Sequence, residues 1–260
     1  MAKANNKSWE KIFKDYKIIS HDFKKEPFSL SAEQIKISCQ DFKQNSQKEP
    51  RLLCKHDSRK DRPDVFIKHN LFLLPIKNGE YVIVKGEGYF DIPDITTPPK
   101  TYNSELDYKL ETSEIGDSEM QHLDFAYASS LIRTFMNDDS LVLTIRGRKY
   151  TPSFSFKVGK QLIETQSVQT EVDGGYEGRK NVVLIEAKNS KTSNTIIRQL
   201  FYPYKQWKTY TQKNVFLLFF ERRKDNGFYY IWQYGFTDEN NYNSIKLIKS
   251  ERYLIDGPNV

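Results

Sequence analysis

One short stretch constrains the fold more than any other part of the chain: an apolar run that ends in two charges. Residues 182–185 (Val-Val-Leu-Ile) are continuously apolar, and Glu186 and Lys188 follow them with the small Ala187 between. Such a run is typical of a strand buried on both faces. Residues two apart on a strand point to the same face, so we expect Glu186 and Lys188 to lie side by side at its end.

A second carboxylate precedes this strand. Asp173 stands thirteen positions before Glu186, just after another β-like run. If the two strands pair as neighbours, Asp173, Glu186 and Lys188 meet at one end of a sheet. The alternative is that Asp173 with Gly174 and Gly175 marks a turn, and that Glu186 and Lys188 form a solvated pair on an edge strand. The apolar run favours the first interpretation. Charged side chains next to a buried strand cost free energy, and a functional role would account for their presence there.

Two carboxylates and an amine predict a site for a hard cation. Mg²⁺ is bound in proteins by one or two carboxylates together with water and substrate phosphate. A lysine next to metal-bound water can stabilise the charge that develops in phosphodiester cleavage. The four histidines and two cysteines have no metal-site spacing, which disfavours zinc. We therefore expect Mg²⁺ as the cofactor, Mn²⁺ as a substitute, and Ca²⁺ to bind without supporting cleavage.

Asp173 followed by Glu186-Ala187-Lys188 resembles the PD-(D/E)xK nuclease signature, in which an acidic residue precedes a strand ending in Asp/Glu-x-Lys. Val172 stands where the signature has proline. A wider block, from about residue 141 to 207, is similar to a group of type II restriction endonucleases. The stretches that carry this similarity are 144–149, 154–156, 169–177 and 198–204.

The resemblance implies a catalytic core with a central mixed sheet flanked by helices. It implies Asp173, Glu186 and Lys188 as catalytic residues. The metal ligands would be Asp173, Glu186 and the backbone carbonyl of Ala187. Glu171 is the candidate for a further ligand, since it shares a strand face with Asp173; the alternative is a solvent-facing glutamate.

The implied activity is that of a type II restriction endonuclease. Such an enzyme hydrolyses phosphodiester bonds in double-stranded DNA at a short specific sequence, depends on Mg²⁺, and leaves 5′-phosphate ends. Its DNA methyltransferase would be a genetic rather than a physical partner, and a homodimer is left open. Two alternatives remain: a structure-specific repair or recombination nuclease, and a non-catalytic DNA-binding protein with a structural acidic cluster.

The positive charge of the chain is unevenly placed. Residues 1–70 carry 16 Lys and Arg against 10 Asp and Glu, whereas the remainder is balanced, and the net charge is +6. This asymmetry indicates an acidic partner for the N-terminal part, although lysine-rich surfaces are also common without one. The candidate DNA-binding residues are a basic N-terminal group, a predicted basic turn between two strands, and one glutamine on the following helix: Arg51, Lys55, Arg59, Lys60 and Arg62; Arg146, Arg148 and Lys149; and Gln199.

The order of the predicted elements indicates an α/β (α+β) fold. Predicted helices cover residues 8–17, 29–44, 117–137 and 195–211. Predicted strands cover 51–54, 65–67, 71–75, 81–86, 141–145 paired with 153–158, 161–171, 182–187, 215–220, 228–236 and 245–253. A segment rich in proline and threonine at 92–100 suggests a basic α+β recognition region over 1–100 and a catalytic domain over 105–260.

The same sequence indicates where the protein works. No apolar run approaches the roughly 18 residues that a membrane span requires. The first residues contain no apolar stretch of a secretion signal, and two cysteines give no disulfide framework. We therefore expect a cytoplasmic protein with no membrane partner.

Overall fold

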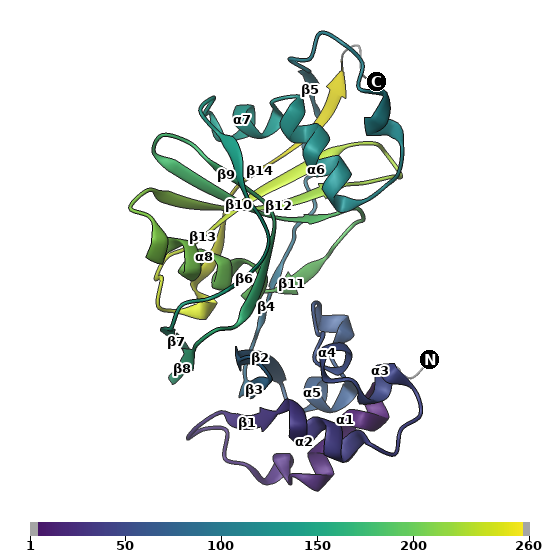
Figure 1. Cartoon of the computed structure of the whole chain (residues 1–260), viewed down its shortest axis with the longest axis vertical. Coiled ribbons are helices and arrows are strands. Elements are labelled where there is room, and N and C mark those ends of the chain that lie inside the picture. The colour runs from purple at the N-terminus through teal and green to yellow at the C-terminus, as the bar shows by residue number, and fades with distance from the viewer. Residues whose placement is uncertain (1–4, 257–260) are drawn as a thin grey trace.

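The chain folds into two α+β parts, shown at the bottom and top of Figure 1. The computed structural model describes residues 5–256, so the outer ends of both predicted domains, 1–4 and 257–260, lie outside the described residues. A mixed α+β architecture was expected, and it is found. No helix within the described residues is long and apolar enough to cross a membrane.

In the N-terminal part, helices pack on a three-stranded antiparallel sheet in the order β1-β3-β2. Trp9, Phe13 and Phe66 form an aromatic centre for its core. A hairpin at residues 78–79 joins β2 to β3, and Gly79 adopts the positive φ of 76° that favours glycine. The elements are α1 (Asn6–Asp15), η1 (Ile18–Ser20), β1 (Phe28–Ser31), α2 (Ala32–Cys39), α3 (Asn45–Lys48), α4 (Pro50–Leu53), η2 (Arg59–Asp61), α5 (Asp64–Lys68), β2 (Leu71–Lys77) and β3 (Glu80–Lys85).

Two predicted strands of this part are wrong, because residues 51–54 and 65–67 are helical. Pro50 occupies the first turn of α4, where proline needs no hydrogen-bond donor. Pro63 directly precedes α5, whose first residue is Asp64. Short apolar runs fit a strand or a helix equally well, and these flanking residues decide between them.

The predicted helix at 29–44 is shorter than expected and begins after a strand. Ser31 caps α2 by accepting a hydrogen bond from the backbone of Gln34, whose side chain bonds back to Ser31. The residues before Ser31 form β1, which pairs with β3. The polar segment at 43–50, for which no helix or strand was predicted beyond residue 44, contains the short helix α3.

The C-terminal part is built on a seven-stranded mixed sheet in the order β5-β14-β13-β12-β10-β9-β6. The pairs β10–β12 and β14–β5 are parallel, and the others are antiparallel. Its elements are β4 (Tyr89–Asp91), β5 (Lys100–Asn103), η3 (Glu111–Glu114), α6 (Glu119–Ala128), α7 (Leu131–Met136), β6 (Val142–Tyr150), β7 (Phe154–Val158), β8 (Gln161–Thr165), β9 (Gln169–Glu177), β10 (Asn181–Lys188), β11 (Asn194–Ile196), α8 (Arg198–Tyr210), β12 (Asn214–Arg222), β13 (Tyr229–Phe236), η4 (Tyr242–Ser244) and β14 (Ile245–Asp256).

The strand β10 is buried on both faces, as its sequence predicts. Val182 and Leu184 pack in the cluster that includes Leu200 of α8. Val183 and Ile185 belong to the opposite cluster, which includes residues of α6 and α7. Helices therefore cover both faces of the sheet at its centre, and the charged end of β10 emerges between them.

The helix predicted over 195–211 begins only at Arg198, because residues 194–196 form β11. Three further errors in this part concern the path of the backbone. The helix expected over 117–137 is broken into α6 and α7 at Ser130, which has a φ of 64°. The strands β6 and β7 do not pair with each other, since β6 pairs with β9 and β7 with β8. The strand expected over 161–171 is interrupted at Ser167, which has a φ of 54°. Each error is a local change of backbone direction that apolar periodicity does not reveal.

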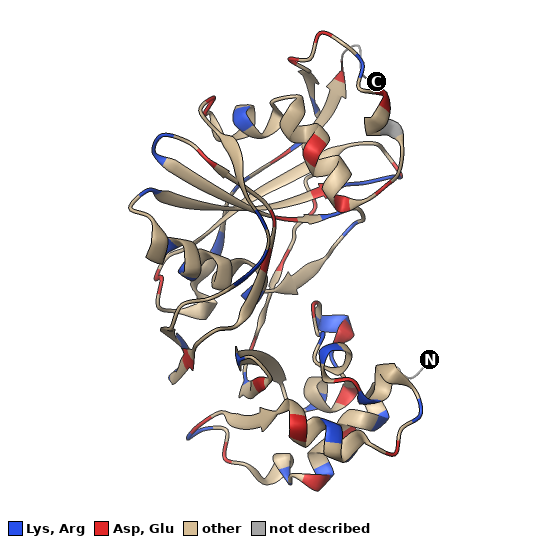
Figure 2. Ribbon diagram, in the orientation of Figure 1, with Lys and Arg blue, Asp and Glu red and all other residues tan. Residues whose placement is uncertain are grey.

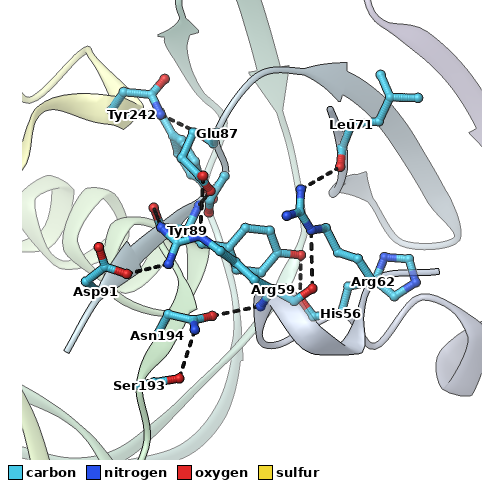
Figure 3. Close-up of polar contacts among 12 residues, drawn as sticks. His56, Arg59, Arg62, Leu71, Glu87, Tyr89, Asp91, Ser193, Asn194 and Tyr242 are labelled. Atoms are coloured by element: carbon cyan, nitrogen blue, oxygen red, sulfur yellow. Dashed lines mark hydrogen bonds and ion pairs between the residues drawn. The ribbon is translucent and has the colours of Figure 1, made fainter. Parts of the chain in front are cut away.

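The two parts share a hydrophobic cluster in which Phe72 of β2 packs with Phe156 and Tyr242, and two sets of polar contacts add to it. The β7–β8 hairpin reaches the N-terminal part through Gln161, whose amide donates to the Phe23 carbonyl at 2.6 Å. The strand β4 lies at the beginning of the C-terminal part and pairs with β11. Residues 56–62 of the N-terminal part pack against these two short strands, as Figure 3 shows.

Candidate functional site

The register of β9 and β10 brings Asp173 and Glu186 together. The two strands pair as far as Ile185 and Gly174, so Asp173 and Glu186 follow at the point where the ladder ends. The backbone N–H of Ala187 donates to the Asp173 carboxylate at 2.8 Å, which fixes Asp173 against β10. The side chain of Asp173 therefore belongs to the sheet end and not to a free turn.

The ammonium of Lys188 lies against Glu186. Its Nζ donates to Glu186 Oε1 at 2.5 Å and to the Ala187 carbonyl at 2.8 Å. The side chain of Glu186 is 10% exposed and that of Lys188 is 25% exposed. Lys188 thus contacts one largely desolvated carboxylate, and the carbonyl expected as a metal ligand is in contact with it.

Burial sets the protonation of this cluster. Burial raises the pKa of Glu186 to about 7, against the opposing effect of Lys188. Burial also raises the pKa of Asp173, although the Ala187 N–H and Lys188 counteract it. Burial lowers the pKa of Lys188, but the Glu186 carboxylate more than offsets this and the net pKa is raised. The carboxylates are held where ionisation is costly, and a cation would relieve that cost.

These residues line a cavity of about 640 Å³ between the sheet end, the starts of two helices and the N-terminal part. Its lining side chains are polar or charged with few exceptions: Lys55, Asp57, Glu119, Gln169, Thr170, Glu171, Asp173, Glu186, Lys188, Arg198, Gln199 and Pro203. A neighbouring cavity of about 670 Å³ shares Lys55 and Asp57 with it and continues over the N-terminal part to Lys60. Together they form a polar path across the junction of the two parts.

Three charged lining residues were not predicted as functional residues: Glu119, Asp57 and Arg198. Glu119 begins α6 and contributes to the raised pKa of Lys188. A glutamate after the capping Ser118 is common in a first helical turn, so its sequence gives no sign of a functional role. Asp57 and Arg198 are 141 positions apart in the chain and form an ion pair at 3.8 Å. No local pattern links residues so distant.

The prediction that residues 146–149 form a turn is wrong. These residues lie within β6, the edge strand of the large sheet, where the register shifts near Gly147. Arg146 is ion-paired with Asp124. Arg148 pairs with Glu171 at 3.2 Å, and Glu171 lies at the cavity rim with its side chain 54% exposed.

The predicted DNA contacts of the N-terminal part fall into two groups. Arg51, Lys55 and Lys60 are exposed, as is Lys149 of β6. Arg59 instead pairs with two carboxylates of the C-terminal part, and the buried Arg62 donates to the Leu71 carbonyl at 3.3 Å (Figure 3). Figure 2 shows the basic residues of this part spread over several elements and interleaved with acidic ones.

The glutamine of the predicted DNA-binding group lies in the wall of the cavity. Gln199 lines the cavity and its side-chain oxygen accepts a hydrogen bond from the Thr195 hydroxyl. Tyr202, a turn later, is fully buried and donates to the Pro75 carbonyl at 2.9 Å. Tyr202 is a core residue, and of the two only Gln199 can meet a substrate.

Two family models cover most of the chain and meet at the start of the C-terminal part. The model described as Domain of unknown function (DUF6997) matches residues 84–254. The chain belongs to the DUF6997 family. The model described as Domain of unknown function (DUF6996) matches residues 6–83. No curated protein and no solved structure matches the chain. The DUF6997 region contains Asp173, Glu186 and Lys188, and the DUF6996 region supplies Lys55 and Asp57.

Proposed function

We propose that the chain is a Mg²⁺-dependent endonuclease that cleaves double-stranded DNA at a short specific sequence, in the manner of type II restriction endonucleases. The observation that carries this proposal is the meeting of Asp173, Glu186 and Lys188 at one end of β9 and β10, inside a polar cavity. Burial raises the pKa of both carboxylates, so ionising Asp173 and Glu186 costs free energy, which is typical of functional sites.

The donor atoms of the cavity suit a hard cation. No His or Cys is among the described residues that line it. Nor do residues 5–256 contain a group of three or more His, Cys, Asp or Glu side chains arranged to hold a metal on its own. Mg²⁺ does not require such a group, because it keeps several waters and takes further oxygens from substrate phosphate. Asp173, Glu186 and the Ala187 carbonyl would hold it.

Each residue has a distinct part in this proposal. When bound, Mg²⁺ lowers the pKa of water and polarises the phosphate. Asp173 is positioned by the Ala187 N–H, so its carboxylate needs no rearrangement to bind. Lys188 keeps its proton, since its pKa is raised, and can stabilise the charge that develops on the phosphate.

The arrangement of elements around the site agrees with the proposal. Helix α6 is followed by the antiparallel strands β6, β9 and β10, and α8 then crosses to β12, which lies parallel to β10. A central mixed sheet flanked by helices, with an acidic residue before the strand that ends in Glu186-Ala187-Lys188, is what the PD-(D/E)xK resemblance implies. This order supports the proposal together with the residues of the site.

The proposal is tested with plasmid DNA and three proteins: wild type, Lys188→Ala and Lys180→Ala. Lys180 is an exposed lysine at the opposite end of the β9–β10 hairpin and serves as the matched control. We expect discrete fragments from wild type and Lys180→Ala with Mg²⁺ and no cutting with excess chelator. Lys188→Ala should cut at least about 100-fold more slowly and still bind DNA, since it removes one charge-stabilising group.

The pattern of cutting separates the alternatives. Fixed bands support a sequence-specific enzyme, whereas cutting only at junctions or other DNA structures supports a repair or recombination nuclease. DNA binding without cutting would leave a non-catalytic DNA-binding protein. Normal turnover by Lys188→Ala would contradict the assignment of the site.

A further inference from the structure

A short segment of the N-terminal part is fixed to the edge of the candidate active site by its backbone. The Asp57 carbonyl accepts hydrogen bonds from Ile196 N at 2.9 Å and from Thr195 Oγ1 at 3.1 Å. Two residues further, the backbone N–H of Arg59 donates to the Asn194 side chain at 2.7 Å (Figure 3). These contacts hold residues 57–59 along β11, the strand that leads into α8.

Side chains reinforce the same attachment. Arg59 lies 3.3 Å from the Glu87 carboxylate and also pairs with Asp91. The hydroxyl of the buried Tyr89 donates to the His56 carbonyl at 3.0 Å. We call these contacts of residues 56–59 with residues 87–91 and 194–196 the junction clamp. It gives the segment a defined position relative to the catalytic strands.

The junction clamp places two cations on the wall of the catalytic cavity. Lys55 comes from the N-terminal part and Arg198 from the start of α8, and both line the cavity with Glu186 and Lys188. The carboxylate of Asp57 lies between the two cations, 3.6 Å from Lys55 Nζ and 3.8 Å from an Arg198 terminal nitrogen. Both distances exceed the usual hydrogen-bond range of about 2.7–3.2 Å, so the pairs are loose.

We infer that Lys55 and Arg198 form a subsite for one phosphate of a nucleic-acid strand, built jointly by the two parts of the chain. Asp57 keeps the two cations near each other in the free protein, and the phosphate replaces it as their partner. This inference rests on the proposed function, because the phosphate would belong to the strand whose neighbouring bond lies at Asp173 and Glu186. The catalytic cavity is then incomplete without the N-terminal part.

The chemistry of the two side chains fits this role. Arginine presents a planar fork of donors that matches phosphate oxygens, and lysine contributes a point charge. The same cavity is also lined by Asp173 and Glu186, which would repel a phosphate unless cations held it. Cations beside an acidic metal site orient the strand so that one bond faces the metal, and such positioning contributes strongly to catalysis.

The side chains of Lys55 and Arg198 can be changed without breaking the junction clamp, which rests on other groups. We therefore compare wild type with Lys55→Gln, Arg198→Gln and the double variant. The matched control is Lys36→Gln, an exposed lysine of α2 outside the cavity lining. Binding of a fluorescent DNA duplex by the whole chain is measured by anisotropy in Ca²⁺ over a series of salt concentrations.

Each phosphate contact contributes about one to the slope of log affinity against log salt concentration. We expect each single substitution to weaken binding and to lower this slope by about one, the double variant to lower it by about two, and Lys36→Gln to leave it unchanged. Equal thermal unfolding of all proteins confirms that the fold is kept.

The outcomes separate this inference from the proposed function. Unchanged slopes in both single variants would overturn the subsite even if wild type cleaves DNA, and so would a wild type that binds no duplex. Lowered slopes in a protein that binds DNA but never cuts it would support the subsite and contradict the nuclease proposal.

Discussion

Two clusters of charge lie close to each other in this protein and differ in how far they are exposed to solvent. In the junction clamp, Arg59 faces Glu87 and Asp91, whose side chains are 51% and 74% exposed. In the candidate site, Lys188 is in contact with Glu186, whose side chain is only 10% exposed, and Asp173 adds a second carboxylate. Each cluster sets two carboxylates against one cation, but the first is partly solvated and the second is largely desolvated.

The difference shows which cluster serves the fold. Partly exposed ion pairs contribute about 0–1 kcal/mol each and carry little strain, so the junction clamp mainly fixes geometry. Buried charges are costly, and the raised pKa values of Asp173 and Glu186 show that their own neighbours do not repay that cost. A cluster left in that state is a candidate for binding a cation from outside.

The largest effect expected from this comparison is on metal binding at Asp173. Replacing it in Asp173→Asn removes a ligand and one of the two like charges. We expect cleavage to fall by at least about 100-fold, as when a group that stabilises the transition state is lost. The melting temperature without metal should stay equal or rise, and the increase caused by Mg²⁺ or Ca²⁺ should disappear.

A thermal-shift series with and without each cation measures this directly. Asp139→Asn, at an exposed aspartate outside the cavity, is the control and should respond to metal as wild type does. Equal metal-induced shifts in wild type and Asp173→Asn would show that Asp173 is not a ligand.

The second effect is a pH dependence of opposite sign with and without metal. Burial raises the pKa of Glu186 from its ordinary value of 4.5 to about 7 in the folded state. A raised acid pKa stabilises the fold at low pH, and that stabilisation is lost as pH rises from 4.5 through about 7. Metal binding requires the ionised carboxylate, so affinity for Mg²⁺ and cleavage should increase over the same range.

Melting temperatures of wild type and Glu186→Gln across this pH range test the sign. Without metal, the melting temperature of wild type should fall relative to that of Glu186→Gln as pH rises. With Mg²⁺, wild type should gain stability with pH and Glu186→Gln should not. A wild type whose metal response is flat between pH 5 and pH 8 would contradict the buried carboxylate as a ligand.

The same comparison explains what the sequence could reveal. The candidate site depends on local rules: the apolar run fixes β10 as buried, and alternation then places Glu186 beside Lys188. The junction clamp depends on partners far along the chain, since Arg59 is 32 residues from Asp91 and 135 from Asn194. Distances of that kind follow only from packing, and for this reason the sequence indicated Arg59 as a DNA contact and gave no sign of Asp57 or Arg198.

The short elements of the N-terminal part show a second limit. The residues at 51–54 and 65–67 are apolar enough for strands, yet Pro50 begins a helix there and Pro63 directly precedes another. The long strands β10, β12 and β13 were predicted because many consecutive residues in each fit a strand. Prediction therefore succeeded where a pattern was long and failed where one proline or one left-handed residue decided the path.

The smallest effect expected is at Arg59, and it decides between two roles for one residue. As part of the junction clamp, Arg59 holds Glu87 and Asp91 and is not available to DNA. We then expect Arg59→Ala to lower the free energy of unfolding by about 1 kcal/mol, as partly exposed ion pairs do. Its DNA-binding slope against salt should stay that of wild type.

Denaturant unfolding and the anisotropy series measure the two quantities on one preparation. Lys55→Gln is the reciprocal control, since it should keep the stability and lower the slope by about one. If Arg59→Ala instead kept full stability and lost about one unit of slope, Arg59 would be the phosphate contact that its sequence indicated, and its ion pairs would be partners exchanged for DNA on binding.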